Sequence, residues 1–125
     1  TVDEFKGKLI PDEETGKWKW VDGVLIEAMR KGHWLLLDEI NSAQPEILFT
    51  LNSLLDDDHY VVIEEKDGEV VHPHQNFRLF ASMNPTGRYT GTKELNIALK
   101  SRFAVVQFPE TDKNKQVSIM RSHFP

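Results

Sequence analysis

Two adjacent acids at the end of an apolar run are the residues of this sequence most suited to chemistry. Asp38 and Glu39 directly follow Trp34-Leu35-Leu36-Leu37, a run without polar alternation that predicts a strand buried on both faces. Ligands of open α/β sheets bind at the carboxyl ends of the strands. There the first acid could hold Mg²⁺ together with phosphate oxygens, and the second could orient a water molecule for attack. The alternative is a strand that simply ends in two solvated acids.

An amide and a guanidinium group lie near two further predicted strands. Asn84 follows the apolar segment 78–83, and at the same sheet edge its amide could hydrogen-bond a γ-phosphate or the attacking water. Asn-Pro is also an ordinary turn opener, so Asn84 is informative only beside the acids. Arg102 follows a short predicted helix. It could neutralise the charge that develops during phosphoryl transfer, as an arginine finger does, or it could be a solvated or ion-paired arginine.

The elements that would position these residues alternate between helices and strands. In chain order we expect a hairpin of residues 5–10 and 17–21, a helix 22–31, a strand 33–37, a helix from Pro45, a hairpin of residues 60–64 and 69–72, a strand 78–83, a helix around 95–99, a strand 104–108 and a helix from Asp112 through Met120. This order predicts an α/β fold with a parallel sheet, decorated by two β-hairpins.

Length, charge and cysteine content exclude several classes of protein. The 125 residues suffice for one compact domain. A net charge of −5 argues against duplex nucleic acid as the main partner, since binding there depends on basic surfaces. The absence of cysteine excludes disulfides, thiolate metal sites and cysteine nucleophiles, and it suits the cytosol. The apolar runs are far shorter than the ~20 residues that cross a bilayer, so we expect no membrane contact.

Taken together, the motifs resemble those of AAA+ ATPases in the dynein-related subgroup, which includes MoxR-like and midasin-like members. The resemblance covers nearly the whole chain. It rests on the segments Trp20-Val21-Asp22-Gly23, Leu35-Leu36-Leu37-Asp38-Glu39-Ile40-Asn41, Leu51-Asn52-Ser53-Leu54-Leu55-Asp56-Asp57, Asn76-Phe77-Arg78-Leu79-Phe80-Ala81, Asn84-Pro85 and 91–103. It implies the core of a parallel-sheet P-loop NTPase with two hairpin insertions.

The same resemblance assigns roles to four residues. Asp38 would be the Walker B acid that binds Mg²⁺ and nucleotide, and Glu39 the acid that polarises water. Asn84 would be sensor 1, in contact with the nucleotide, and Arg102 the arginine finger. The implied protein hydrolyses ATP with Mg²⁺, forms a homo-oligomeric, hexameric ring and remodels complexes of a protein client. The implied compartment is the cytoplasm, or the nucleus for a midasin-like member.

One expected motif is missing from the sequence. The phosphate loop G-x-x-x-x-G-K-[ST] does not occur, and the glycine-containing segment 87–93 has the wrong spacing. The family places this loop upstream of Thr1 and its lid with sensor 2 beyond Pro125. We therefore expect residues 1–125 to be a partial AAA+ large subdomain, from Walker B to the arginine finger, that is inactive alone. The alternative function is a non-catalytic interaction module that kept the fold and lost nucleotide binding.

Three weaker features each allow two interpretations. Trp18 and Trp20 share one face of a predicted strand and could touch a partner, or pack against neighbouring protein surface. His72-Pro73-His74 could be part of a metal site, and Asp56-Asp57-Asp58 part of a cation site. For both of these segments we favour the alternative, solvated residues of loops and turns.

Overall fold

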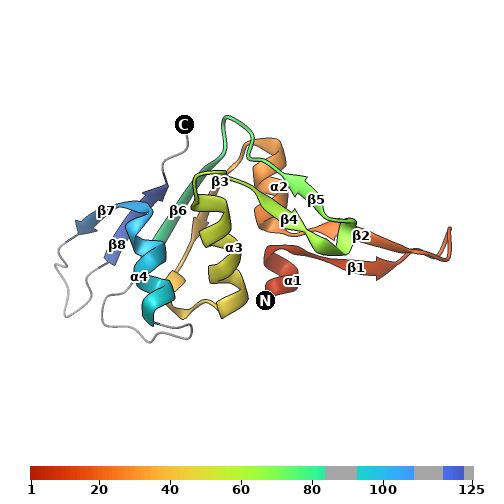
Figure 1. The fold of residues 1–125 in the computed structure, drawn as a ribbon, viewed down its shortest axis with the longest axis horizontal. Helices are drawn as coiled ribbons and strands as arrows, with labels where there is room; N and C mark the ends of the chain where they lie inside the picture. The colour runs from red at the N-terminus through yellow and green to blue at the C-terminus, as the bar shows by residue number, and fades with distance from the viewer. Residues whose placement is uncertain (84–92, 109–116, 123–125) are drawn as a thin grey trace.

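The computed structural model describes residues 1–83, 93–108 and 117–122 (Figure 1). In chain order its elements are α1 (Val2–Phe5), β1 (Gly7–Pro11), β2 (Trp18–Asp22), α2 (Val24–Lys31), β3 (Trp34–Leu37), the 3₁₀ turn η1 (Ile40–Ser42), α3 (Pro45–Leu55), β4 (Val61–Ile63), the 3₁₀ turn η2 (Glu64–Lys66), β5 (Glu69–Val71), β6 (Arg78–Met83), α4 (Lys93–Ser101), β7 (Phe103–Phe108) and β8 (Val117–Ser122). Among the helices described, none is long and apolar enough to cross a membrane.

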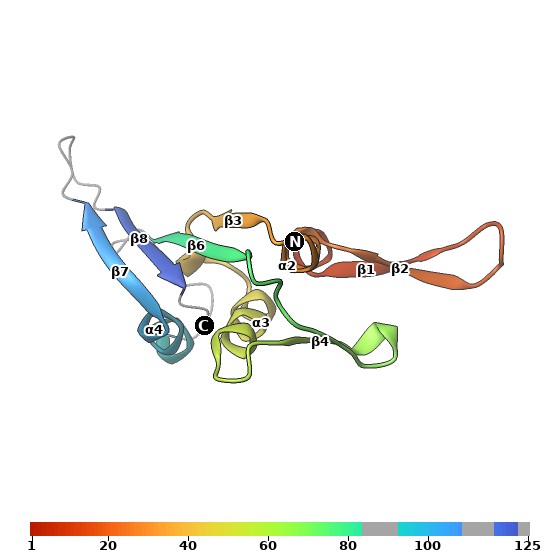
Figure 2. The same ribbon diagram turned by 90° about the horizontal axis from the view of Figure 1, so that it is seen from above.

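The largest sheet of the described residues has four strands in the order β3-β6-β8-β7 and lies at the end of the molecule opposite the β1–β2 hairpin (Figures 1 and 2). β3 and β6 are parallel, with Leu36 opposite Phe80, as the buried strands predicted. β8 runs antiparallel to both β6 and β7, so β6 and β7 point the same way although β8 separates them. Helices α3 and α4 lie on one side of this sheet (Figures 1 and 2).

Helices α3 and α2 pack as their sequences predict. Pro45 begins α3 at a position where no backbone N–H is needed, and leucines at helical spacing form its buried face. In α2 the apolar residues are also buried, and Gly32 ends the helix with a left-handed backbone (φ 73°). These faces join the apolar residues of β6 in one core, whose fully buried members include Leu25, Ile26, Met29, Leu48, Leu51, Leu54, Phe77 and Leu79.

The prediction that the 33–37 strand is buried on both faces is wrong for one face. Leu35 and Leu37 pack against the core, but the side chains of Trp34 and Leu36 are 73% and 63% exposed. β3 is the edge strand of the sheet, and the helices α3 and α4 cover only the opposite face. The ring of Trp34 instead packs beside Phe80 of the neighbouring strand, with centroids 5.5 Å apart.

The predicted C-terminal helix is also wrong where the structure describes it. Residues 117–122 form strand β8, while residues 112–116 of that prediction lie outside the described part of the chain. The apolar spacing of Val117 and Met120 suggested a helix. A strand in this place pairs its backbone on both sides, with β6 and with β7, and these hydrogen bonds outweigh a weak helical pattern.

The two predicted hairpins are confirmed. β1 pairs with β2 and β4 with β5, both antiparallel, and the β1–β2 hairpin extends well away from the sheet (Figures 1 and 2). The first strand begins at Gly7 rather than Phe5, because residues 2–5 form the short helix α1, which Thr1 caps. Gly7 has a φ of 136°, and a Cβ there would lie 2.4 Å from the ring of Trp20, so the base of this hairpin requires glycine.

Candidate functional site

The two acids and one serine meet at the carboxyl ends of β3 and β6. The last paired residues of these strands are Leu37 and Ala81, so Asp38 and Ser82 come next in register. The Ser82 hydroxyl donates a hydrogen bond to Oδ1 of Asp38. It also accepts one from the backbone N–H of Glu39, at 2.9 Å. The parallel pairing of β3 and β6 thus brings together residues 44 positions apart in the sequence.

Glu39 has an unusual backbone conformation for its residue type. Its φ of 52° and ψ of 54° are left-handed, which costs a non-glycine residue about 1 kcal/mol. The conformation turns the chain sharply from β3 into η1, where Ser42 N donates to the carbonyl of Glu39 at 2.9 Å. Ile40 and Asn41 are buried directly behind this turn, whereas Asp38 and Glu39 are exposed. The turn therefore presents both carboxylates to solvent, accessible to a ligand.

The oxygen donors at this edge suit magnesium. Asp38, Glu39 and Ser82 offer only carboxylate and hydroxyl oxygens, which are ligands for hard cations. Within the described residues, no group of three or more His, Cys, Asp or Glu side chains is arranged to hold a metal alone. Mg²⁺ commonly uses only one or two carboxylates and takes its other ligands from water and substrate phosphates, so the donor set fits.

A small apolar cavity adjoins Asp38. Its volume is about 210 Å³, and it lies between the end of β3, η1 and the start of α3. The residues that line it besides Asp38 are Phe5, Leu36, Leu37, Ile40, Ala43 and Ile47. Because the side chains that line it besides Asp38 are all apolar, the cavity offers no further side-chain ligand for a metal.

Arg102 lies at the other edge of the sheet. β7 points the same way as β6, and pairing through Ser122 sets Phe103 level with Leu79. Arg102 is thus near the start of β6, about four residues back from Ser82 and three strands from β3. At ~3.3 Å per residue and ~4.8 Å per strand, its backbone is roughly 20 Å from that of Asp38.

The Arg102 side chain is held within its own chain. Its Nη1 donates to the carbonyl of Ala98 at 2.9 Å, and its Nη2 lies 3.7 Å from Oδ1 of Asp56. Asp56 is 66% exposed, and exposed pairs of this kind contribute little to stability. Asn84, the fourth predicted site residue, lies outside the described residues, although β6 ends beside it at Met83.

Ser82 is the residue that the sequence reasoning missed. It is the polar member of an otherwise apolar stretch, Leu79 to Met83, and it aligns with Asp38 once the two strands are paired in parallel. The polar residue is therefore visible in the sequence, but its position beside Asp38 follows only from the register of β3 with β6.

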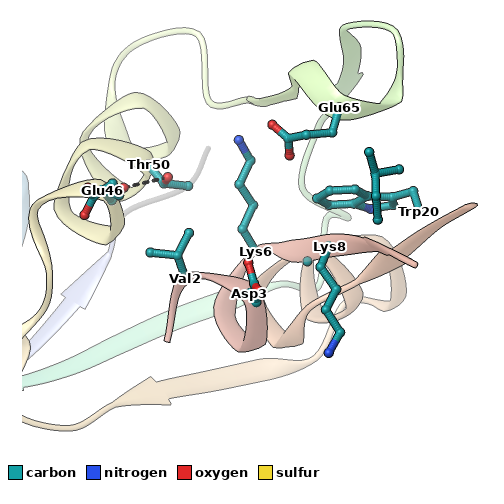
Figure 3. Close-up of a pocket in the computed structure, with 10 residues that line it drawn as sticks. Val2, Asp3, Lys6, Lys8, Trp20, Glu46, Thr50 and Glu65 are labelled. Carbon is teal, nitrogen blue, oxygen red and sulfur yellow. Dashed lines mark hydrogen bonds between the residues drawn. The ribbon is translucent and has the colours of Figure 1, made fainter. Parts of the chain in front are cut away.

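A larger cavity lies away from the acids, at the base of the first hairpin. It measures about 520 Å³ and is lined by residues of α1, β1, α3 and η2 and by the ring of Trp20. Lys6 and Glu65 extend toward each other across it (Figure 3). Trp20 packs against the core, whereas Trp18 is 68% exposed, so the two tryptophans of this strand have different environments.

Arg30 of α2 links the two hairpins. Its Nε donates to Asp22 at the end of β2, at 2.9 Å. Its two Nη atoms donate to the two carboxylate oxygens of Glu69 in β5, at 3.3 and 2.9 Å. The guanidinium of Arg30 lowers the pKa of the Glu69 carboxyl, and Lys66 adds to this effect. Trp20 Nε1 donates to the other oxygen of Asp22 at 2.7 Å, which extends the network into the first hairpin.

Comparison with known proteins identifies the family. The model of the AAA domain of the dynein-related subfamily matches residues 1–103. The chain is 41% identical to a midasin of Giardia intestinalis over 123 residues, and 41% identical to a midasin of Dictyostelium discoideum over 119 residues. These alignments cover 97% and 95% of this chain but only 2% of each midasin. An uncharacterized protein of Staphylococcus haemolyticus is 40% identical over 107 residues, 84% of this chain and 40% of that protein.

The chain therefore belongs to the dynein-related subfamily of AAA domains and is midasin-like in sequence. This confirms the resemblance drawn from the motifs, and with it a P-loop NTPase core that carries two hairpins. The family match ends at Phe103, so it includes the turn at Asp38 and Glu39 as well as Arg102.

Proposed function

We propose that this chain is part of a AAA+ ATPase, to which it contributes the metal-binding acid, the water-polarising acid and the arginine finger. The observation that carries the proposal is the joining of Asp38 and Glu39 to β6 through Ser82, at the carboxyl ends of two parallel strands. Membership of the AAA family makes phosphoryl transfer from ATP to water the reaction to expect there.

Each residue then has a distinct task. Asp38 would bind Mg²⁺, and when bound this ion neutralises negative charge on the phosphate oxygens. Glu39, exposed beside it, would accept a hydrogen bond from the attacking water and orient that water in line with the γ-phosphate. Asn84, directly after β6, would hydrogen-bond the γ-phosphate or the water as sensor 1.

Arg102 would act on a nucleotide bound by a neighbouring subunit. A side chain of about 7 Å cannot span the roughly 20 Å between the backbones of Arg102 and Asp38. To reach a neighbour's nucleotide, the Arg102 guanidinium would exchange its hydrogen bond to the Ala98 carbonyl and its long, exposed contact with Asp56 for contacts across the interface. The separation supports action of Arg102 across a subunit interface. The assembly proposed here is a homo-oligomeric, hexameric ring in which each site is completed by the next subunit.

The remaining parts of the nucleotide site would come from the complete protein. We propose that residues 1–125 are a partial AAA+ large subdomain, with the phosphate loop and the lid contributed by other segments. The complete protein would remodel complexes of a protein client, in the cytoplasm or, if it works as a midasin, in the nucleus. The net charge of −5 favours a protein client over nucleic acid.

The decisive experiment replaces Glu39 in the full-length protein. Glu39→Gln keeps the size of the side chain and leaves Asp38 in place, so nucleotide affinity should stay within about twofold. Turnover should fall by about 10²-fold or more, because an amide cannot polarise water as a carboxylate does. The measurements are steady-state ATP hydrolysis and equilibrium binding of a nucleotide.

Glu64→Gln, an exposed glutamate of η2, is the matched control and should hydrolyse ATP at the wild-type rate. Turnover at the wild-type rate in Glu39→Gln would show that Glu39 is not the water-polarising residue. A wild-type protein that binds its client but neither binds nor hydrolyses ATP would instead establish the non-catalytic interaction module.

A further inference from the structure

Ser82 occupies the point where the two acids are joined to the rest of the sheet. The backbone pairing of β3 with β6 stops at Leu37 and Ala81, one residue before Asp38. Beyond that pair, the Ser82 side chain continues the connection between the strands. It touches both acids, the carboxylate of one and the backbone of the other. A serine that only filled space at the end of β6 would need neither contact.

The two hydrogen bonds have a fixed direction. A backbone N–H can only donate, so the Ser82 oxygen is the acceptor toward Glu39. The single hydroxyl proton of Ser82 is then available for Oδ1 of Asp38. This arrangement fixes one oxygen of Asp38 and leaves the other oxygen, Oδ2, available for a metal. It also anchors the left-handed residue Glu39 by its own N–H.

We propose that Ser82 is a positioning residue for ATP hydrolysis, which sets the carboxylate of Asp38 and the backbone of Glu39 at a fixed mutual geometry. The inference rests on the proposed function. Ser82 touches neither the nucleotide nor the water in this role. It acts through the two acids. Without its hydroxyl, Asp38 and Glu39 would hold the metal and the water in less well-defined positions. Groups that orient metal ligands from behind typically change affinity or activity by about 10- to 100-fold.

The test uses four variants of the full-length protein. Ser82→Ala removes the hydroxyl. Ser82→Thr keeps it and Ser82→Val does not, and these two side chains have the same shape, so their comparison isolates the hydroxyl even if the alanine variant fails to fold. Ser53→Ala, at an exposed position in the last turn of α3, is the matched control.

Two measurements are made on each variant. The first is kcat and KM for ATP. The second is the gain in ADP affinity that Mg²⁺ causes, measured by calorimetry with and without the ion, which needs no turnover. We expect Ser82→Ala and Ser82→Val to lower kcat by about 10- to 100-fold, to change KM by less than about threefold, and to lose most of the Mg²⁺-dependent gain. Ser82→Thr and Ser53→Ala should stay near wild type in both measurements.

Three results would overturn the inference. Ser82→Val that matches Ser82→Thr in kcat and in the Mg²⁺ effect would show that the hydroxyl has no role. Equal losses in Thr and Val, accompanied by a lower thermal midpoint in both, would reduce Ser82 to a packing residue. Wild-type protein without any ATP turnover would refute the proposed function itself, a failure that is visible before any Ser82 variant is compared.

Discussion

At the scale of single residues, the candidate site depends on one glutamate, Glu39, whose backbone is left-handed although its residue type disfavours that conformation. Glu39 adopts a conformation that glycine or asparagine would take more readily, and the hydrogen bonds at Ser82 and Ser42 hold it there. Strained residues of this kind persist where the surroundings over-determine them, often at functional sites. The turn serves to bring two consecutive carboxylates out of the sheet and into solvent.

The role proposed for Asp38 gives a prediction distinct from that for Glu39. Asp38→Asn keeps an oxygen that can accept the hydrogen bond of Ser82, so the fold should be retained. It removes the negative charge that binds Mg²⁺, so nucleotide affinity with Mg²⁺ should fall by about tenfold, or about 1.4 kcal/mol, while affinity in EDTA should not change. Titration of ADP into the full-length protein measures both.

The matched control is Asp57→Asn, at an exposed position just after α3. Equal affinities of the Asp38 and Asp57 variants in the presence of Mg²⁺ would contradict the metal-binding role.

Sequence reasoning identified the acids because an apolar run that ends in two carboxylates is a local pattern. Ser82 was beyond its reach, since a serine two residues before Asn84 acquires a role only through the register of two strands. The distance between Arg102 and Asp38 likewise depends on the order of the strands in the sheet, and the sequence around either residue does not reveal that order.

At the scale of elements, α2 holds both hairpins through one side chain. Arg30 binds Asp22 of β2 and Glu69 of β5, so the two insertions are fixed to the same helix and to each other. Each hairpin alone would be marginally stable, as isolated two-stranded hairpins are. Their attachment to a helix that is part of the core supplies the missing support.

This attachment should weaken in acid. Hydrogen bonds from Arg30 and Lys66 lower the pKa of Glu69 below its ordinary value of 4.5. A carboxyl with a lowered pKa stabilises the folded state above that ordinary value, and the stabilisation is lost as pH falls through the lowered pKa. Glu69→Gln should therefore speed amide exchange in residues 60–72 by a few-fold near pH 7, and the difference from wild type should disappear in acid.

The measurement is hydrogen exchange by mass spectrometry, with variant and wild type compared at the same pH. The pKa of Glu27 is also lowered, by Lys31, but this glutamate is present in both proteins and cancels in the comparison. Glu64→Gln in the same hairpin should exchange like wild type. A difference that persists unchanged well below pH 4 would rule out the ionised Glu69 as its cause.

The elements that the sequence predicted well carry strong local signals. Asp67 and Gly68 both have positive φ, as a tight hairpin turn demands, and Pro45 begins its helix. The failures at β3 and β8 have a shared cause. In both cases the sequence of the strand does not reveal its neighbours in the fold. The apolar residues of β3 do not show whether a helix covers each of its faces. In β8, backbone pairing with distant strands overrides a helical pattern of apolar residues.

At the scale of the whole molecule, the proposed acids and the proposed finger lie at opposite edges of one sheet. If each nucleotide lies between two subunits, a subunit without Arg102 harms only its neighbour's site, and a subunit without Glu39 harms only its own. Arg102→Ala and Glu39→Gln should each abolish turnover in uniform rings, since a finger contributes roughly 10³- to 10⁵-fold in rate.

Rings assembled from both variants should regain part of the activity. Wherever an Arg102→Ala subunit supplies the sound Glu39 and a Glu39→Gln subunit supplies the sound Arg102, one interface is complete. ATP turnover is measured as the mixing ratio varies, and exchange of subunits is verified independently by native mass spectrometry. If verified mixed rings showed no ATP turnover at any mixing ratio of the two variants, that result would contradict action of Arg102 on a neighbour's nucleotide.

The β1–β2 hairpin is held at its base by Trp20, Asp22 and Arg30 and extends away from the rest of the molecule, so a small rotation at the base moves its tip over a larger distance. Its free arm from Gly7 to the turn is about seven residues, or ~23 Å at ~3.3 Å per residue. A rotation of α2 by about 10° would therefore displace the tip by about 4 Å, the width of a side chain. A rotation of α2 that small could leave the packing of the core intact. At the exposed tip of the hairpin, the resulting displacement would be large enough to move a molecule bound there.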